Sequence, residues 1–141
     1  MSIDNKAIVR RLFEMWNTGN VDQIEELYSP DYVSDYRPYA PLRTGHAAIK
    51  AMVQNARATF PDYHEALEEM IAEDDKVVVR LTITGTQKGP WGPIPPTGKQ
   101  LRYEEILILR FTDGKVVHQR GLVDNLHALR QLGVVPTPPS S

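Results

Sequence analysis

Cysteine is absent from this chain of 141 residues, so disulfides, thiolate metal ligands and cysteine nucleophiles are excluded together. An excess of one charge is also missing, because the net charge is −2 and the lysines and arginines are scattered. Without a basic stripe to contact phosphates, we expect no nucleic-acid partner. No apolar run approaches the roughly 20 residues that span a bilayer, so we expect no membrane partner.

The first residues, MSIDNKAIVRR, carry charge early and have no apolar stretch of the kind found in secretory leaders. We therefore expect a cytoplasmic protein. The composition, with 41% hydrophobic and 24% charged residues, is typical of a single globular domain at this length. We assign residues 1–135 to that domain and the proline-rich residues 136–141 to a C-terminal tail.

Motifs for metal, phosphate or serine-nucleophile chemistry are lacking as well. The four histidines do not have the spacing of metal ligands, so we predict no metal and no cofactor. The glycines of GPWGPIPPTG, residues 89–98, lack the strand-then-helix context of a phosphate loop, and we expect a crossover or a lid there. No serine stands in a GxSxG setting.

The first part of the chain has the spacing of helices. Apolar residues recur at helical intervals over residues 2–20. A capping box that begins at Asn20 predicts a short second helix over residues 21–28. Thr44 is placed to cap a third helix that ends near Ala58.

From Tyr63 onward the apolar residues alternate with a period of two, which is typical of strands. The Asp-Gly pair in TDGK marks a tight hairpin, and Gly133 ends a final helix. After a brief extended piece at 30–36, the predicted strands and final helix cover residues 63–72, 76–87, 99–111, 115–124 and 125–132.

Helices that precede an antiparallel sheet indicate an α+β architecture. We expect three N-terminal helices packed on a strongly curved, mostly antiparallel sheet. The two layers would enclose a pocket, which is where small ligands commonly bind.

Strand parity indicates which side chains face this pocket, because successive side chains of a strand point to opposite faces. In the strand from Lys99 the odd-numbered residues form the more apolar set, and Tyr103 and Glu105 belong to it. The odd set of the last strand is Val117, Gln119, Gly121 and Val123. The polar side chains predicted on the core side are therefore Tyr103, Glu105 and Gln119.

A carboxylate on an apolar face is unfavourable unless it is paired or protonated, so Glu105 requires a partner or a raised pKa. Such a group suits a general acid or base, with Tyr103 and Gln119 orienting the substrate. The alternative is a satisfied core acid that is hydrogen-bonded to Tyr103 or Gln119.

Several aromatic and apolar residues are further candidates. Trp16, Tyr32 and Tyr36 are placed to line the pocket mouth, although aromatic residues at such positions are more often core. On the opposite face of the strand from Lys99, Ile106 and Ile108 stand among charged residues. We interpret them as an oligomer contact, with ordinary exposed apolar residues as the alternative.

A family resemblance covers about residues 6–134. It is carried by WNTGNVDQIEELYSPDYV, ATFPDYH, VVVRLTITGTQKG, IPPTGK, FTDGKVVHQ and DNLHALRQLG. Together these segments resemble the SnoaL-like polyketide cyclases, within the nuclear-transport-factor-two-like or cystatin-like fold. The resemblance implies a cone-shaped α+β barrel around a pocket, and a homodimer or homotetramer through the outer sheet face. This fold serves many reactions and also non-catalytic binders.

In these cyclases, the resemblance implies an intramolecular aldol condensation run by acid/base catalysis without a cofactor. An aspartate on the last strand takes the proton, and a histidine on the preceding strand assists. Counting back from RQLG and FTDG, these positions are Gly121 and Leu107, so both groups are absent and the pocket is wider and more apolar. A second acid matches Asp124, which is a catalytic candidate and equally an N-cap of the final helix.

Three hypotheses follow. The first is a cofactor-independent cyclase or isomerase that acts on a hydrophobic small molecule, with Glu105 as acid or base in place of the missing groups. The second is a module that binds such a molecule without reacting it. The third is an oligomerisation scaffold whose interior is filled by side chains.

Overall fold

A computed structural model describes residues 4–136 of the chain. Helices come first and strands follow, as predicted, and the tail at 136–141 lies outside the described residues apart from Pro136. The elements in chain order are α1 (Asn5–Thr18), the 3-10 helix η1 (Val21–Gln23), α2 (Ile24–Leu27), β1 (Tyr28–Asp35), β2 (Arg43–Thr44), α3 (Gly45–Thr59), β3 (His64–Glu73), β4 (Lys76–Thr86), β5 (Gln100–Thr112), β6 (Lys115–Val123) and α4 (Asn125–Leu132).

Local interactions set the ends of the early helices. The Asp4 side chain accepts a hydrogen bond from the first turn of α1, and Gly19 ends this helix with a φ of 76°, in the left-handed region that favours glycine. The predicted second helix is shorter than expected: Asn20 caps the 3-10 turn η1, and α2 is a single turn because β1 already begins at Tyr28. Thr44 stands at the N-cap of α3, but its side chain makes no capping hydrogen bond.

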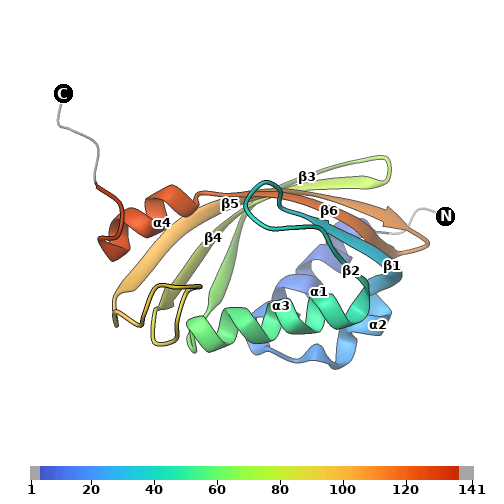
Figure 1. The fold of residues 1–141 in the computed structure, drawn as a ribbon. Coiled ribbons are helices and arrows are strands. Elements are labelled where there is room, and N and C mark those ends of the chain that lie inside the picture. The colour runs from blue at the N-terminus through green and yellow to red at the C-terminus, as the bar shows by residue number, and fades with distance from the viewer. Residues whose placement is uncertain (1–3, 137–141) are drawn as a thin grey trace.

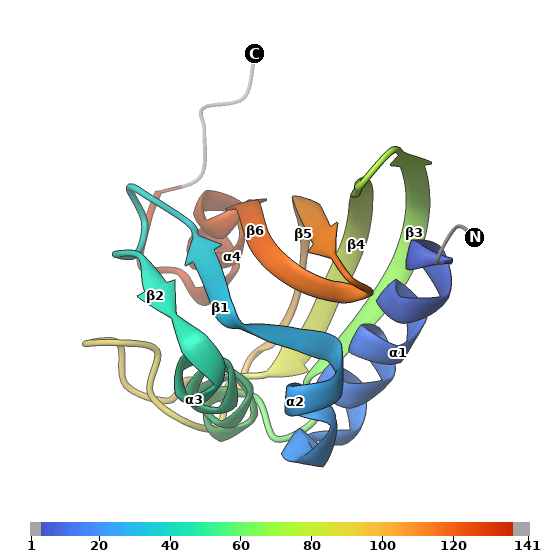
Figure 2. The same ribbon diagram turned by 90° about the vertical axis from the view of Figure 1, so that its right-hand side faces the viewer.

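The sheet has six strands in the order β2-β1-β6-β5-β4-β3. The brief extended piece predicted at 30–36 is in fact the eight-residue strand β1, which pairs parallel with β6 while every other neighbouring pair is antiparallel. The strong curvature is confirmed, as Figure 2 shows, but the sheet does not close into a barrel because β2 and β3 remain separate edges.

The helices α1, α2 and α3 cover one face of the sheet, and the core lies between the two layers (Figure 1). The predicted parity is confirmed in β5, where every odd residue is buried and every even residue is exposed. It fails at one position of β6: Val116 is fully buried and Val117 only half-buried, because the ladder with β5 shifts between Arg110 and Phe111.

The other face of the sheet lies on the side away from α1, α2 and α3 (Figure 1). Large apolar side chains are exposed on it, including the predicted Ile106 at 52% and Ile108 at 41%. Ile71 and Leu122 are exposed there as well. No helix between residues 4 and 136 combines the length and the apolar character that crossing a bilayer requires.

Candidate functional site

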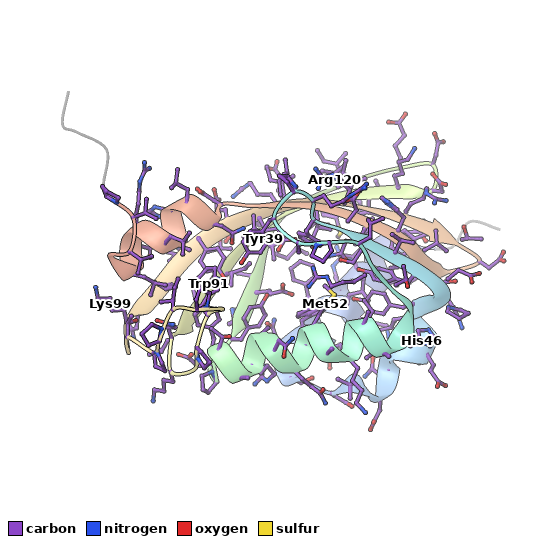
Figure 3. The ribbon with its side chains drawn as sticks, in the orientation of Figure 1. Tyr39, His46, Met52, Trp91, Lys99 and Arg120 are labelled. Atoms are coloured by element: carbon purple, nitrogen blue, oxygen red, sulfur yellow. The ribbon has the colours of Figure 1, made fainter. Side chains whose placement is uncertain are left out.

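A cavity of about 270 Å³ lies between the helices and the concave face of the sheet. An interior filled by side chains, which the scaffold hypothesis requires, is therefore not what the structure contains. Figure 3 shows the side chains that converge on this space from the sheet, from α3 and from the loops. The lining is mainly aromatic and apolar, and its charged or strongly polar members are Arg43, Asn55, Glu65, Glu105, Gln119 and Asn125.

Glu105 lies on β5, enters this cavity and is 6% exposed. Its Oε2 accepts a hydrogen bond of 2.5 Å from the Tyr36 hydroxyl, and within residues 4–136 its Oε1 has no hydrogen-bond partner. Burial raises the pKa of Glu105 to about 7, although the bond from Tyr36 acts in the opposite direction. The sequence predicted either a partner or a raised pKa for Glu105, and the structure supplies a partner, which is Tyr36 and not Tyr103 or Gln119.

A line of hydrogen bonds supports Glu105 from behind. Tyr32, on β1, donates through its hydroxyl to Oε1 of Gln119 at 3.1 Å. The amide nitrogen of Gln119 donates to the Tyr36 hydroxyl, which in turn donates to Glu105. Gln119 and Tyr36 each accept one hydrogen bond and donate one, and the line fixes the carboxyl of Glu105 in one orientation.

Gly121 leaves room for the Tyr36 ring. A Cβ atom added at Gly121 would overlap with Cε2 and Cζ of Tyr36. The position that the resemblance assigns to the aspartate of the polyketide cyclases is thus covered by a tyrosine that binds Glu105. Gly121 itself does not line the cavity, whereas Leu107, at the position assigned to the histidine, does.

Glu65, which sequence reasoning missed, brings a second carboxyl group to the cavity from β3. The hydroxyl of Tyr63 donates to its Oε2 at 2.7 Å, and the Asn17 side chain bonds to both the N–H and the carbonyl of its backbone. Burial raises the pKa of Glu65 to about 8, and the negative charge of Glu105 adds to this effect. Pairing with the inward-facing Ile83 of β4 places Glu65 on the core side, and this pairing between strands was not visible in the sequence of β3 alone.

Aromatic side chains from two loops meet at the cavity. The Trp91 indole, in the loop expected to be a crossover or a lid, donates to the Tyr39 hydroxyl at 2.9 Å (Figure 3). The Trp91 ring also lies 6.1 Å from that of Tyr103, between ring centroids. Gln87 is fully buried and accepts hydrogen bonds from Thr97, so it holds the two ends of this loop together.

The structure sorts the remaining predicted site residues. Trp16, Tyr36, Tyr103 and Gln119 line the cavity, as expected. Tyr32 does not, because it is completely buried behind Gln119 and supports it.

Asp124 also lies outside the cavity. Its side chain accepts a hydrogen bond from the backbone of His127 at 3.1 Å and caps α4, so its interpretation as an N-cap is the correct one. Between residues 4 and 136, no three His, Cys, Asp or Glu side chains are grouped to hold a metal ion.

Comparisons with known proteins agree on one family. The family model described as SnoaL-like polyketide cyclase matches residues 6–132. Aklanonic acid methyl ester cyclase AcmA of Streptomyces galilaeus is 33% identical over 129 residues, which are 90% of this chain and 89% of the relative. Nogalonic acid methyl ester cyclase of Streptomyces nogalater is 32% identical over 84% of this chain and 89% of the relative. The crystal structure of IdmH from Streptomyces antibioticus matches with a TM-score of 0.83 and 26% identity, over 94% of this chain and 100% of that chain.

Proposed function

This chain belongs to the SnoaL-like polyketide cyclase family, and we propose that it closes or isomerises a ring in a hydrophobic small molecule by proton transfer, without a cofactor. The observation that carries the proposal is the pair of cavity carboxyls, Glu105 and Glu65, each bound by a tyrosine hydroxyl. Their pKa values, raised to about 7 and about 8, suit groups that exchange protons near neutral pH.

Glu105 acts as the base. Tyr36 occupies its Oε2, so Oε1 is left to accept a proton from a C–H bond beside a carbonyl. In ring closure, the electron pair of that bond forms the new C–C bond to a second carbonyl carbon. The oxygen of this second carbonyl takes the proton of Glu65, which acts as the acid, and exchange with water then resets both groups. Two carboxyls in one cavity, one deprotonated and one protonated, can divide the roles of base and acid in this way.

Tyr103 orients the substrate from the cavity wall, and Gln119 acts through Tyr36 as a positioning residue. Within residues 4–136 the Tyr103 hydroxyl has no hydrogen-bond partner, and the ring packs near Trp91. The amide of Gln119 is already engaged at both its oxygen and its nitrogen, so it holds the tyrosine that holds the base.

The substitution Glu105→Gln tests the proposal with the methyl esters of aklanonic and nogalonic acids, for which the two relatives are named. Loss of a positioned base lowers kcat by about 10²-fold to 10⁴-fold. Glu104→Gln is the matched control, because it changes the neighbouring carboxylate on the outer face of the same strand. Turnover by Glu105→Gln at the wild-type rate would refute the assignment.

A module that binds a ligand without reacting it is the second candidate. It is favoured by the absence of an acid at Gly121 and of an imidazole at Leu107, the positions where the resemblance assigns the catalytic groups. Mass spectrometry of a ligand extracted from the purified protein distinguishes the two. A ligand that remains unchanged on incubation with the protein supports binding alone.

We also propose that the chain self-associates through the outer sheet face, as a homodimer or homotetramer. The exposed Ile106 and Ile108 support this assignment. Replacing both by Lys is expected to yield monomers in light scattering, and an unchanged mass would contradict this interface. The cytoplasmic location expected from the sequence stays a prediction.

A further inference from the structure

Arg43 is the cationic side chain of the cavity. It lies on the short edge strand β2 and lines the same space as Glu105. Its Nε is buried and has no hydrogen-bond partner within residues 4–136, and none of the salt bridges in that part of the chain includes it. The centre of its guanidinium is 5.8 Å from the centroid of the Tyr36 ring. Arg43 therefore has an aromatic neighbour but no anionic partner.

Arg43 is half-buried, and its buried Nε has lost contact with water without gaining a protein acceptor, which is unfavourable for a cationic donor. The cation–π contact with Tyr36 offsets only part of this cost. The two cavity carboxyls do not compensate it, since Glu105 is bound by Tyr36 and Glu65 lies on the opposite edge strand. The missing partner is then an anion that enters with the ligand.

We propose that Arg43 binds a planar pair of anionic oxygens on the substrate, either a carboxylate or the enolate of a β-dicarbonyl group. The proposal rests on the proposed function, since it concerns the substrate of the same cavity. The guanidinium presents its N–H donors in a flat fork, which matches two coplanar oxygens. The mainly aromatic and apolar lining suits the rest of a flat, unsaturated molecule.

The sheet order gives this contact a consequence for the reaction. Arg43 lies on β2, Glu105 on the interior strand β5 and Glu65 on the far edge strand β3 (Figure 2). A substrate anchored at Arg43 therefore extends across Glu105 toward Glu65. Arg43 in this way selects which carbon of the substrate meets the base.

Binding of matched anionic and neutral ligands tests the proposal. We suggest calorimetry with 2-naphthoic acid against methyl 2-naphthoate, and with 2-acetylcyclohexane-1,3-dione, whose enolate presents two oxygens on the same side, against its methyl enol ether, all at pH 7. The wild type is expected to bind an anion about 10-fold to 100-fold more tightly than its neutral partner. Arg43→Gln should abolish this preference and leave the affinity for the neutral compound within about 2-fold. Arg43→Lys keeps the charge without the fork and should give an intermediate preference.

The two ligand pairs distinguish the sources of the anion, because preference in the first pair identifies a carboxylate and preference in the second an enolate. Equal affinities within both pairs, no binding of any of the four, or a preference that survives Arg43→Gln in a protein with wild-type circular dichroism would overturn the proposal. Glu105→Gln separates it from the proposed function. If that variant retains both turnover and the anion preference, the catalytic assignment fails while the role of Arg43 stands.

Discussion

The two carboxyl groups of the cavity differ in the position of their strands in the sheet and in their hydrogen-bond partners. Glu105 lies on an interior strand, and a line of hydrogen bonds that starts at the fully buried Tyr32 leads to it. Glu65 lies on an edge strand and is half-buried, and within residues 4–136 its carboxyl has one hydrogen-bond partner, Tyr63. Both groups face the same space, but only Glu105 is fixed by a chain of partners.

This difference explains why Glu105 and Glu65 suit different roles in the proposed reaction. A base that takes a proton from carbon must point at that carbon, and the line behind Glu105 supplies the fixed orientation. For the proposed reaction, this difference in hydrogen-bond partners favours Glu105 as the base and leaves Glu65 as the acid.

The largest effect that we expect is on stability, and it comes from removing the negative charge of the Glu105 carboxylate. Folding raises the pKa of Glu105 from 4.5 to about 7, so between these values the folded state binds more protons than the unfolded chain. Stability therefore falls as pH rises through this window. Glu105→Gln removes the penalty and should be more stable than the wild type at pH 9 by up to roughly 3 kcal/mol, but not at pH 4.

Urea denaturation at the two pH values measures this difference. Glu104→Gln serves again as the control, because Glu104 is exposed on the outer face and pairs with Arg80 there. It should show no gain in stability at pH 9. Equal stability of Glu105→Gln and the wild type at pH 9 would mean that the cavity carboxyl is not held in a raised-pKa state.

The next effect is steric. It disturbs the contact between Tyr36 and Glu105 without removing a charged group. Gly121→Ala places a methyl group against the Tyr36 ring, which must move away from Glu105. Overpacking of this kind reduces the free energy of unfolding by about 1–3 kcal/mol. Urea denaturation of the variant gives the loss directly.

A double-mutant cycle with Tyr36→Ala isolates the cause. If the ring is the obstacle, Gly121→Ala should be nearly neutral once Tyr36→Ala is in place. Additive losses would place the strain elsewhere. The same clash means that restoring an aspartate at Gly121 requires a smaller side chain at position 36 as well.

The overall architecture could be predicted from the sequence because it depends on local periodicity. The alternation in β5 identified the inward-facing Glu105, and the helical intervals located α1 and α3. Long-range pairing was not available to such reasoning. The strand β1 exists because it pairs in parallel with β6, and the shift that turns Val117 away from the core belongs to the β5–β6 ladder and not to β6 alone.

The site was only partly predictable, for the same reason. Tyr36 and Glu105 are 69 positions apart in the sequence, so no short motif contains both residues. Glu65 stands in the segment HEALEEMIAE, where glutamates occur at both odd and even positions, and parity there does not single out one of them. Arg43 belongs to a two-residue strand, which is too short to show any alternation.

A smaller effect concerns the tyrosines that bind the two carboxyls, since each of them lowers the pKa of its partner. The hydrogen bond from Tyr36 lowers the pKa of Glu105, so Tyr36→Phe should raise this pKa above about 7. Tyr63→Phe should likewise raise the pKa of Glu65 above about 8. Tyr32 is linked to Glu105 through three hydrogen bonds, so Tyr32→Phe should change the pKa of Glu105 less than Tyr36→Phe does. Carbon NMR titration of the glutamate carboxyls measures all three, and a lowered pKa in Tyr36→Phe would contradict the contact.

The smallest effect that we expect is the influence of the Glu105 charge on the pKa of Glu65. Burial is the main cause of the raised pKa of Glu65, and the charge of Glu105 adds to it. Glu105→Gln removes that charge, so the pKa of Glu65 should fall below about 8 and still stay above its ordinary value of 4.5. The same titration detects the change, and Glu104→Gln should not produce it. If the pKa of Glu65 does not change, the charge of Glu105 does not help to keep Glu65 protonated. The proposed division of roles between Glu105 as base and Glu65 as acid would then have no electrostatic support.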